Sequence, residues 1–249
     1  GTKVVSVSPD YAESTTSSDA WLNVKAGTDA ALAMAMGHVI LKEYYIDKET
    51  PYFKEYAKEF TDMPFLVRVE DINGAVQPGR FLNAKDLGRQ EDGADFHMVL
   101  IDEITNEIVI PNGTMGERHT NPQKWNLRLE NRDTGAKIDP RLSVFDQRED
   151  VTVVKLPYFG DEEHEGVIER AIPTITVQTV DGPVKVTTVY DLILANYGID
   201  RGIGGEVATS YTDDTPYTPT WQEKITGIKA DIAIATAREF ADNAEKTKG

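Results

Sequence analysis

A glycine, a threonine and an aspartate meet at one predicted helix start, Gly27, Thr28 and Asp29. Free N–H groups at a helix start attract an anion or the polar edge of a ligand. The Asp29 carboxylate can accept two N–H donors from a guanine-like base edge. The same residues also fit a plain cap, in which Thr28 bonds the first-turn amides and Asp29 favours the helix dipole. Because capping alone explains these residue types, the residues by themselves favour the cap.

A second candidate stretch follows the first predicted strand, KVVSVS, which ends at Ser8-Pro9-Asp10. In doubly wound sheets, ligands lie off the carboxyl ends of the strands, beside helix N-termini. A short extended piece, WLNVK, leads to the Gly27 turn in the same way. Ser8 and Asp10 therefore join Gly27, Thr28 and Asp29 as candidate ligand-binding residues.

The four histidines offer little further chemistry. His38 lies within the apolar helix, which favours a packed, hydrogen-bonded core histidine. His164 sits in DEEHE, a run of possible metal ligands that is more typical of a solvated acidic loop. His97 on a predicted strand and His119 in a loop have no visible partner in the sequence. We therefore predict no metal site in this chain.

No local motif completes an active site. The glycine-rich stretch RGIGGEV (201–207) follows a helix rather than a strand, so it fails the context of a dinucleotide-binding loop. The sequence has no phosphate-binding loop and no serine in a nucleophile elbow. Carboxylates are abundant, but no spacing selects one pair as acid and base. We assign no catalytic residue.

Composition excludes several classes of function. The net charge of −16 over 249 residues argues against a nucleic-acid or anionic-membrane surface and indicates a solvated surface, with a docking face for a basic partner as the alternative. The absence of cysteine excludes disulfides, a thiol nucleophile and locally bound iron–sulfur clusters. The apolar runs are too short to cross a bilayer, so this segment is expected to be soluble.

Periodicity and breakers predict the elements that position these residues. Apolar residues at three- and four-residue spacing predict a helix from Thr28, covered on several sides. PYFKEYAKEF (51–60) begins with a proline suited to a first helical turn. Two more helices are predicted, one from Thr188 to Gly198 and a last one from about Lys229, on which Ile232, Thr236, Phe240 and Ala244 lie in line. The stretch DYAESTTSSDA is predicted as a polar loop.

The middle of the chain is rich in short strand candidates, and IDEITNEIVI and VQTVDGPVKV indicate hairpins, the second turning on Asp181-Gly182. We predict an α/β fold, with a Rossmann-like three-layer α/β/α portion at both chain ends and a β-rich insertion between them. The expected parts are an α/β segment at 1–63, the insertion at 64–187 and a helical return at 188–249.

The ends of the sequence look cut. It lacks an initiator methionine and enters a predicted strand almost at once. A parallel strand at the very start requires a preceding crossover that is not present. We therefore expect a fragment of a longer polypeptide.

The stretch VSVSPDYAESTTSSDAWLNVKAGTDAALAMAMGHVIL resembles molybdopterin oxidoreductases of the dimethyl sulfoxide reductase family. Within that family, the closer resemblance is to the catalytic alpha subunits of respiratory nitrate reductases, and it extends over essentially the whole chain. The motifs that carry it, besides GTDAALAMAMGHV, are TDMPFLV, PNGTMGER, KWNL, PYFG, TTVYDLILANYGI, ATSYTDD, YTPTWQEKITGI and AREFADNAEKT.

The resemblance implies that the strand-end loop and the Gly27 turn contact the guanosine of one molybdopterin guanine dinucleotide. Gly27, Thr28 and Asp29 match the family's GTD turn, with Asp29 as acceptor for guanine N–H donors. Ser8 and Asp10 stand where many relatives have the aspartate and arginine of a DPR motif, so the contacts of the first loop differ. The resemblance further implies that the parent holds molybdenum-bis(molybdopterin guanine dinucleotide) and an iron–sulfur cluster whose ligands lie outside this segment.

The resemblance also implies a parent that reduces nitrate to nitrite at the cytoplasmic face of the membrane. Its partners would be the rest of the alpha subunit, an iron–sulfur beta subunit and a haem-bearing membrane subunit. Two alternatives stay open: an interaction segment that docks neighbouring domains or the beta subunit, and a self-standing acidic nucleotide-binding domain. The isolated segment is expected to be inactive, because it contains neither the metal nor the cluster.

Overall fold

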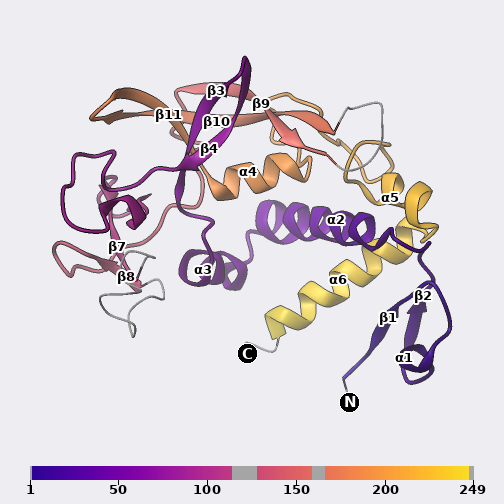
Figure 1. The fold of residues 1–249 in the computed structure, drawn as a ribbon. Helices are drawn as coiled ribbons and strands as arrows, with labels where there is room; N and C mark the ends of the chain where they lie inside the picture. Colours follow the sequence, from indigo (N-terminus) through magenta and orange to yellow (C-terminus); the bar gives the residue numbers. More distant parts are fainter. Residues whose placement is uncertain (1, 114–127, 159–165, 247–249) are drawn as a thin grey trace. The chain divides into compact units, whose positions relative to one another are not determined.

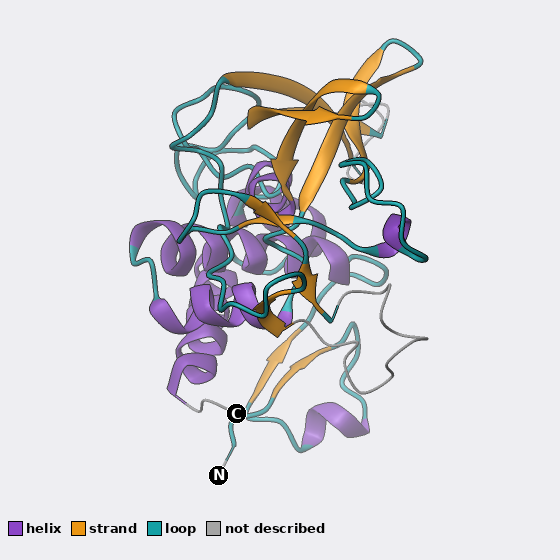
Figure 2. Ribbon diagram, turned by 90° about the vertical axis from the view of Figure 1, so that its left-hand side faces the viewer, coloured by secondary structure: helices purple, strands orange, loops and turns teal. Residues whose placement is uncertain are grey.

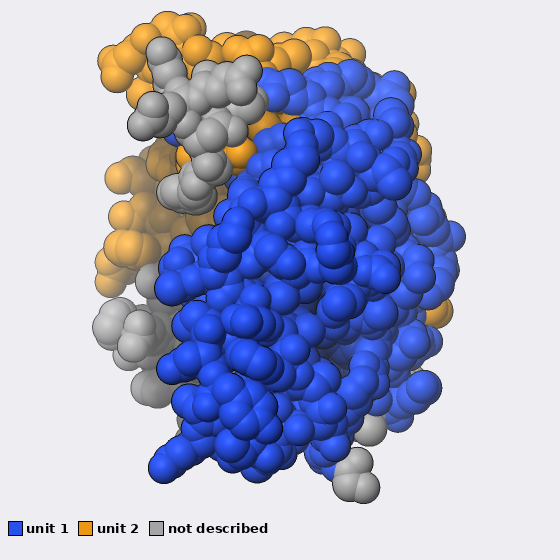
Figure 3. Space-filling model, turned by 90° about the vertical axis from the view of Figure 1, so that its right-hand side faces the viewer, with its two compact units in different colours: residues 1–50, 159–166, 197–249 blue, residues 51–158, 167–196 orange. Residues whose placement is uncertain are grey.

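A computed structural model describes residues 2–113, 128–158 and 166–246. The chain divides into two compact units, which Figure 3 colours separately. Unit 1 comprises residues 1–50, 159–166 and 197–249, and unit 2 comprises residues 51–158 and 167–196. Among the described helices, none is long and apolar enough to cross a membrane.

Unit 1 contains a small parallel sheet of two strands, β1 (Val5–Val7) and β2 (Ala20–Leu22), which lie side by side in Figure 1. Between them runs a one-turn helix, α1 (Glu13–Thr16), so the prediction of a plain polar loop is wrong there. The Thr16 hydroxyl donates to the carbonyl of Glu13 at 2.7 Å. Such local hydroxyl-to-backbone bonds stabilise a tight turn that a polar composition does not reveal.

Four helical segments complete the described part of unit 1: α2 (Asp29–Ile40), the π-helix η1 (Leu41–Asp47), α5 (Pro219–Thr226) and α6 (Ala230–Lys246). The predicted helices at 28 and 229 are confirmed, whereas the π-helix and α5 have no counterpart in the sequence-based assignment. Helix α2 packs against both α5 and α6, which explains its apolar character on several sides. A buried cluster joins it to β2, formed by Leu22, Val24, Leu32, Ile228 and Ala233.

The last helix buries small residues and exposes large ones. Its buried positions are Ala233, Ala237 and Ala241. Ile232 and Phe240, part of the row noted in the sequence, are 42% and 67% exposed. The alanines allow α2 and α6 to pack closely, because a short side chain permits close approach of the two backbones. The larger residues of α6 are therefore on its outer face.

Unit 2 is built on a five-stranded antiparallel sheet in the order β4-β3-β11-β10-β9. The strands are β3 (Leu66–Ile72), β4 (Ala75–Phe81), β9 (Asp150–Pro157), β10 (Val167–Thr179) and β11 (Gly182–Thr188). The edge strands β4 and β9 also contact each other, so the sheet curls into a half-barrel, visible among the orange strands of Figure 2. Its core includes Leu66, Leu82, Val99, Ile101, Val144, Val177 and Val186.

Smaller elements complete the described part of unit 2. Two short antiparallel pairs join β5 (Leu100–Ile101) to β6 (Ile108–Val109) and β7 (Pro111–Asn112) to β8 (Arg128–Asn131). The helices are α3 (Pro51–Phe60), the 3-10 turn η2 (Ala94–Phe96) and α4 (Val189–Asn196). Helix α4 begins as predicted, because the Thr188 hydroxyl accepts the Asp191 N–H at 3.1 Å.

Both predicted hairpins are present. The first joins β5 to β6, and the second joins β10 to β11. In the second, Thr179 pairs with Gly182, so the turn centres on Val180 and Asp181, one residue before the predicted position. Gly182, with φ of +110°, is the first residue of β11 and pairs with Thr179, so it closes the turn and is not one of its two central residues.

The fold is therefore mixed α/β, as expected, with the β-rich part in unit 2. The Rossmann-like layering is not seen in the described residues, where the parallel sheet consists of β1 and β2 alone. Parallel sheets of so few strands rarely stand alone, because both of their faces need cover.

Candidate functional site

The strand-end residues singled out in the sequence lie in unit 1, after two neighbouring strands. Val5, Ser6 and Val7 of β1 pair in parallel with Ala20, Trp21 and Leu22 of β2. The carboxyl ends of both strands therefore lie at one edge of the sheet. The segment from Ser8 to Asp10 leaves β1 there, and the segment leading to Gly27 leaves β2 from the same edge. We call these two segments the strand-end site.

In the first segment, Ser8 and Asp10 contact each other directly. The Ser8 hydroxyl lies 3.0 Å from Asp10 Oδ1 and 3.0 Å from the Asp10 carbonyl, so it can donate to either. The Ser8 N–H donates to the carbonyl of Leu22 at 3.2 Å, which extends the pairing of β1 with β2 by one residue. Asp10 is exposed. The first segment therefore presents a carboxylate that its own serine orients.

The second segment turns on Gly27, whose φ of +78° lies in the left-handed region. A Cβ added at Gly27 would meet no atom within 4 Å, so backbone conformation rather than crowding requires glycine there. The Lys25 N–H donates to the carbonyl of Thr226 at 2.9 Å, and Lys25 Nζ lies 3.3 Å from the carbonyl of Lys224. These bonds fix the base of the turn to the end of α5.

The predicted cap at Thr28 is not formed. Thr28 precedes α2, but its side chain makes no capping bond. Its hydroxyl donates to the carbonyl of Lys25 at 2.6 Å, and this contact holds the turn instead of the helix amides. Among the hydrogen bonds of the described residues, none is made by the backbone N–H groups of Asp29 and Ala30. The start of α2 therefore keeps open donors beside the exposed carboxylate of Asp29.

This arrangement can bind a polar ligand, but it contains no catalytic pair. Open N–H groups donate hydrogen bonds to an anion, and a carboxylate without a partner accepts hydrogen bonds from N–H or O–H groups. No cluster of three or more histidine, aspartate or glutamate residues that could hold a metal occurs in the described part of the chain. The strand-end site therefore presents open N–H donors and carboxylates at the surface of unit 1, without a catalytic pair.

His38 is buried, with an exposed fraction of 2%, as the sequence predicted. Its Nδ1 lies 2.6 Å from the carbonyl of Tyr197, so Nδ1 carries the proton. His97 is also buried but lies after η2 and not on a strand. His119 and His164, the latter in DEEHE, lie outside the described residues.

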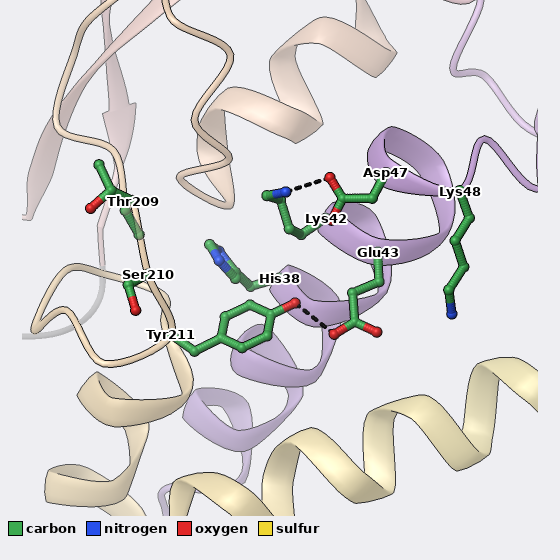
Figure 4. Close-up of a pocket in the computed structure, with 9 residues that line it drawn as sticks. His38, Lys42, Glu43, Asp47, Lys48, Thr209, Ser210 and Tyr211 are labelled. Atoms are coloured by element: carbon green, nitrogen blue, oxygen red, sulfur yellow. Dashed lines mark hydrogen bonds and ion pairs between the residues drawn. The ribbon is translucent and has the colours of Figure 1, made fainter.

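A cavity of about 440 Å³ lies in unit 1 beside His38, at the far end of α2, and sequence reasoning did not find it. Figure 4 shows it between the end of α2 with η1 and the loop at 208–211. Its lining residues are His38, Lys42, Glu43, Asp47, Lys48, Ala208, Thr209, Ser210 and Tyr211. A π-helix often marks a functional position, but the sequence pattern of residues 41–47 did not predict one.

The acidic groups of this cavity are paired within unit 1. Glu43 accepts hydrogen bonds from Tyr211 at 3.0 Å and from Arg238 at 2.7 Å, and Lys42 pairs with Asp47 at 2.5 Å. Burial raises the pKa of Glu43, but the bonds from Arg238 and Tyr211 outweigh it, so the pKa lies below the ordinary 4.5. Burial and the nearby Glu43 raise the pKa of the Tyr211 hydroxyl, which stays a proton donor. These contacts join η1 to the loop and to α6.

Comparison with known proteins adds the family. Residues 1–228 match the molybdopterin oxidoreductase family. The chain is 49% identical over 249 residues to the nitrate reductase alpha chain of Bacillus subtilis (strain 168). It is 45% identical over 251 residues to the respiratory nitrate reductase alpha chain of a Bradyrhizobium species, and 44% identical over 262 residues to the respiratory nitrate reductase 1 alpha chain of Escherichia coli (strain K12).

These matches cover 99% to 100% of this chain but 20% to 25% of the relatives. The chain therefore spans about a fifth to a quarter of the length of the relatives that it matches.

Proposed function

Because the chain belongs to the molybdopterin oxidoreductase family, we propose that it is part of the catalytic alpha subunit of a respiratory nitrate reductase. In this proposal, the strand-end site forms one wall of the pocket for a molybdopterin guanine dinucleotide. The observation that carries it is the start of α2, where Thr28 leaves the first amides open and Asp29 is exposed beside them.

The residues fit the guanosine part of such a cofactor. A guanine edge carries two adjacent N–H donors, which match the two oxygens of a carboxylate such as Asp29. No described residue donates a hydrogen bond to Asp29, so both oxygens are available to a ligand. The open space beside Gly27 allows a ligand to approach the backbone of the turn. Ser8 and Asp10 supply a hydroxyl and a carboxylate to the same edge, suited to ribose hydroxyls.

When bound in the parent, the molybdenum cofactor supplies the oxygen-atom transfer that reduces nitrate to nitrite. The residues of this chain would bind and orient its guanosine end, and we assign them no redox step. The chain has no cysteine, so an iron–sulfur cluster of the parent would take its thiolate ligands from other segments. The proposed partners are the rest of the alpha subunit, an iron–sulfur beta subunit and a haem-bearing membrane subunit, which together would hold the subunit at the cytoplasmic face of the membrane.

The Rossmann-like layering belongs to the same proposal. Strand β1 pairs with β2 on one side, and the described residues place no strand on its other side. A parallel sheet gains stability from further strands and from helices on both faces. We infer that β1 and β2 are the part of a larger parallel sheet that this chain contributes, with α2 and α6 on one face.

The test uses the full-length subunit and the variant Asp29→Ala. We expect the purified variant to retain less guanine nucleotide and less molybdenum per subunit, while its circular dichroism and assembly are unchanged. Asp231→Ala is the matched control, because Asp231 also stands in the first turn of a helix, α6. Asp231→Ala removes the same negative charge from the start of a helix and has a similar effect on the helix dipole, but Asp231 is not part of the Gly27 turn. Normal guanine and molybdenum content in Asp29→Ala would refute the binding role.

Exposed aromatic residues on α3 support a second proposed role, in contacts with other parts of the parent complex. Tyr56 and Phe60 on α3 are 48% and 65% exposed, and their ring centroids lie 5.1 Å apart. Adjacent exposed aromatic rings are typical of interaction surfaces. Substitution of both by serine is expected to weaken association with the beta subunit or with the rest of the alpha subunit without loss of bound cofactor. Unchanged assembly would remove the support for this role.

A further inference from the structure

The strand-end site carries an aromatic pair that the GTD turn does not include. Tyr11 follows Asp10, and Trp21 lies on β2. Their ring centroids are 5.3 Å apart, with an angle of 71° between the ring planes. The two residues are 64% and 37% exposed. Two large aromatic residues therefore lie together at the surface, directly beside Ser8 and Asp10.

A hydrogen bond fixes the orientation of the indole. Trp21 Nε1 donates to the carbonyl of Ser8 at 2.9 Å, at the carboxyl end of β1. Because the indole N–H is satisfied by this backbone oxygen, the ring is held at the edge where the two segments leave the sheet. An edge-to-face pair covers one face of one ring only, so flat apolar surface stays open.

The polar groups beside the aromatic pair suit the ribose of a nucleoside. The Oδ1 of Asp10 is 3.0 Å from the Ser8 hydroxyl, and no described residue donates to its Oδ2. An open ring face next to an available carboxylate oxygen matches a nucleoside, whose flat base can stack on the ring while its ribose hydroxyls donate to Asp10. Base–aromatic stacking of this kind stabilises binding without selecting among bases.

We propose that Trp21 and Tyr11 form a stacking platform for the guanine base of the dinucleotide. This inference rests on the proposed function and adds two residues to it, with a distinct role: the platform contacts the face of the base, whereas Asp29 accepts from its edge. The Nε1 bond to Ser8 makes Trp21 the fixed half of the platform. Tyr11, with the larger exposed fraction, is the half that adjusts to the base.

The experiment measures retention of guanine nucleotide by the full-length, cofactor-loaded subunit after dilution, as nucleotide remaining per subunit over time. We expect Trp21→Leu and Tyr11→Ala each to release the nucleotide about tenfold faster, the scale of one lost stacking contact. Trp21→Phe keeps a ring face but loses the Nε1 donor that fixes it, so its release rate is expected to lie between those of the wild type and Trp21→Leu. Phe240→Leu is the matched control, because Phe240 is a 67% exposed aromatic residue of the same unit.

A second readout reports on Trp21 directly. Guanosine monophosphate added to the cofactor-free full-length subunit is expected to quench tryptophan emission in the wild type and in Phe240→Leu, and to quench it less in Trp21→Phe. Tyr11→Ala removes an exposed side chain, so its folding, checked by circular dichroism, is expected to be intact. Wild-type release rates in both Trp21→Leu and Tyr11→Ala, or equal quenching in Trp21→Phe, would overturn the platform.

The failure of the platform can be told apart from the failure of the proposed function by measuring Asp29→Ala alongside. If Asp29→Ala releases the nucleotide faster while Trp21→Leu and Tyr11→Ala do not, the platform is wrong and the pocket stands. If all three variants retain it normally, both proposals are refuted. Faster release from all three supports both.

Discussion

Glu43 accepts hydrogen bonds from the guanidinium of Arg238 through both carboxylate oxygens, at 2.7 to 3.0 Å, across a sequence separation of 195 residues. The side chain of Glu43 is 14% exposed and that of Arg238 is 51% exposed. Tyr211 donates to the same carboxylate. One acidic group therefore joins η1, α6 and the 208–211 loop of unit 1.

Arg238→Gln is expected to lower the free energy of unfolding by about 1 to 3 kcal/mol, because it leaves a largely buried carboxylate without its charged donor. The measurement is urea denaturation at neutral pH. Lys3→Gln is the control, because Lys3 pairs with Glu239 on the same helix at 2.7 Å, with both side chains more than 40% exposed. Removal of such an exposed pair costs about 0 to 1 kcal/mol. An equal loss of unfolding free energy in Arg238→Gln and Lys3→Gln would contradict the prediction that the Glu43 contact contributes more than an exposed ion pair.

The same carboxylate predicts a dependence of stability on pH. Its pKa in the folded chain lies below the ordinary 4.5, since the bonds from Arg238 and Tyr211 outweigh the effect of burial. A carboxyl with a lowered pKa stabilises the fold above its unfolded pKa, and this contribution is lost as the pH falls through the folded value. The stability difference between wild type and Glu43→Gln is therefore expected to be largest at neutral pH and to shrink below about pH 4.5.

The pH prediction is measured by urea denaturation of both proteins between pH 7 and pH 3. Glu239→Gln controls for the removal of one exposed negative charge from unit 1. A difference between wild type and Glu43→Gln that stays constant across this range would show that the carboxylate does not titrate as the contacts predict.

Local signals predicted much of the fold. Thr188 and Asp191 lie three residues apart, and their reciprocal bonds start α4 at the predicted residue. Both hairpins were also readable, because their strands adjoin in sequence. Helix α5 was missed although its signals were present: Thr218 as a cap, Pro219 in the first turn and Gly227 after the end.

The parts that could not be predicted depend on long-range contacts. The contact of Glu43 with Arg238 links distant residues, and no local pattern pairs one glutamate with one arginine in a chain with this many charges. The π-helix at η1 follows α2 without a break, so its onset depends on packing rather than on a stop signal. At the candidate site, Gly27, Thr28 and Asp29 stood out because they are contiguous. These residue types did not predict that the Thr28 hydroxyl bonds to the carbonyl of Lys25 instead of capping α2.

Gly37 is predicted to be required by packing. A Cβ added there would overlap the ring of Tyr197. In a helix, alanine is intrinsically favoured over glycine by up to about 1 kcal/mol, so an unhindered Gly37→Ala would stabilise the chain. We expect instead a loss of about 1 to 3 kcal/mol from overpacking, measured by thermal or urea denaturation. Tyr197→Leu in the Gly37→Ala background is expected to recover part of this loss, and stabilisation by Gly37→Ala alone would contradict the contact.

Two threonines that precede helices are predicted to differ in their effect on stability. Thr218 is fully buried and accepts the Trp221 N–H at 3.1 Å, whereas the Thr28 hydroxyl donates to the carbonyl of Lys25 and makes no cap. Thr218→Ala removes a cap and is expected to cost about 1 to 2 kcal/mol. Thr28→Ala removes one partly exposed bond and is expected to cost about 0.5 kcal/mol. The measurement is urea denaturation of both variants, and a loss in Thr28→Ala as large as that in Thr218→Ala would restore the cap at α2. Such a result would also weaken the cofactor proposal, because a capped helix start has fewer open N–H groups for a ligand.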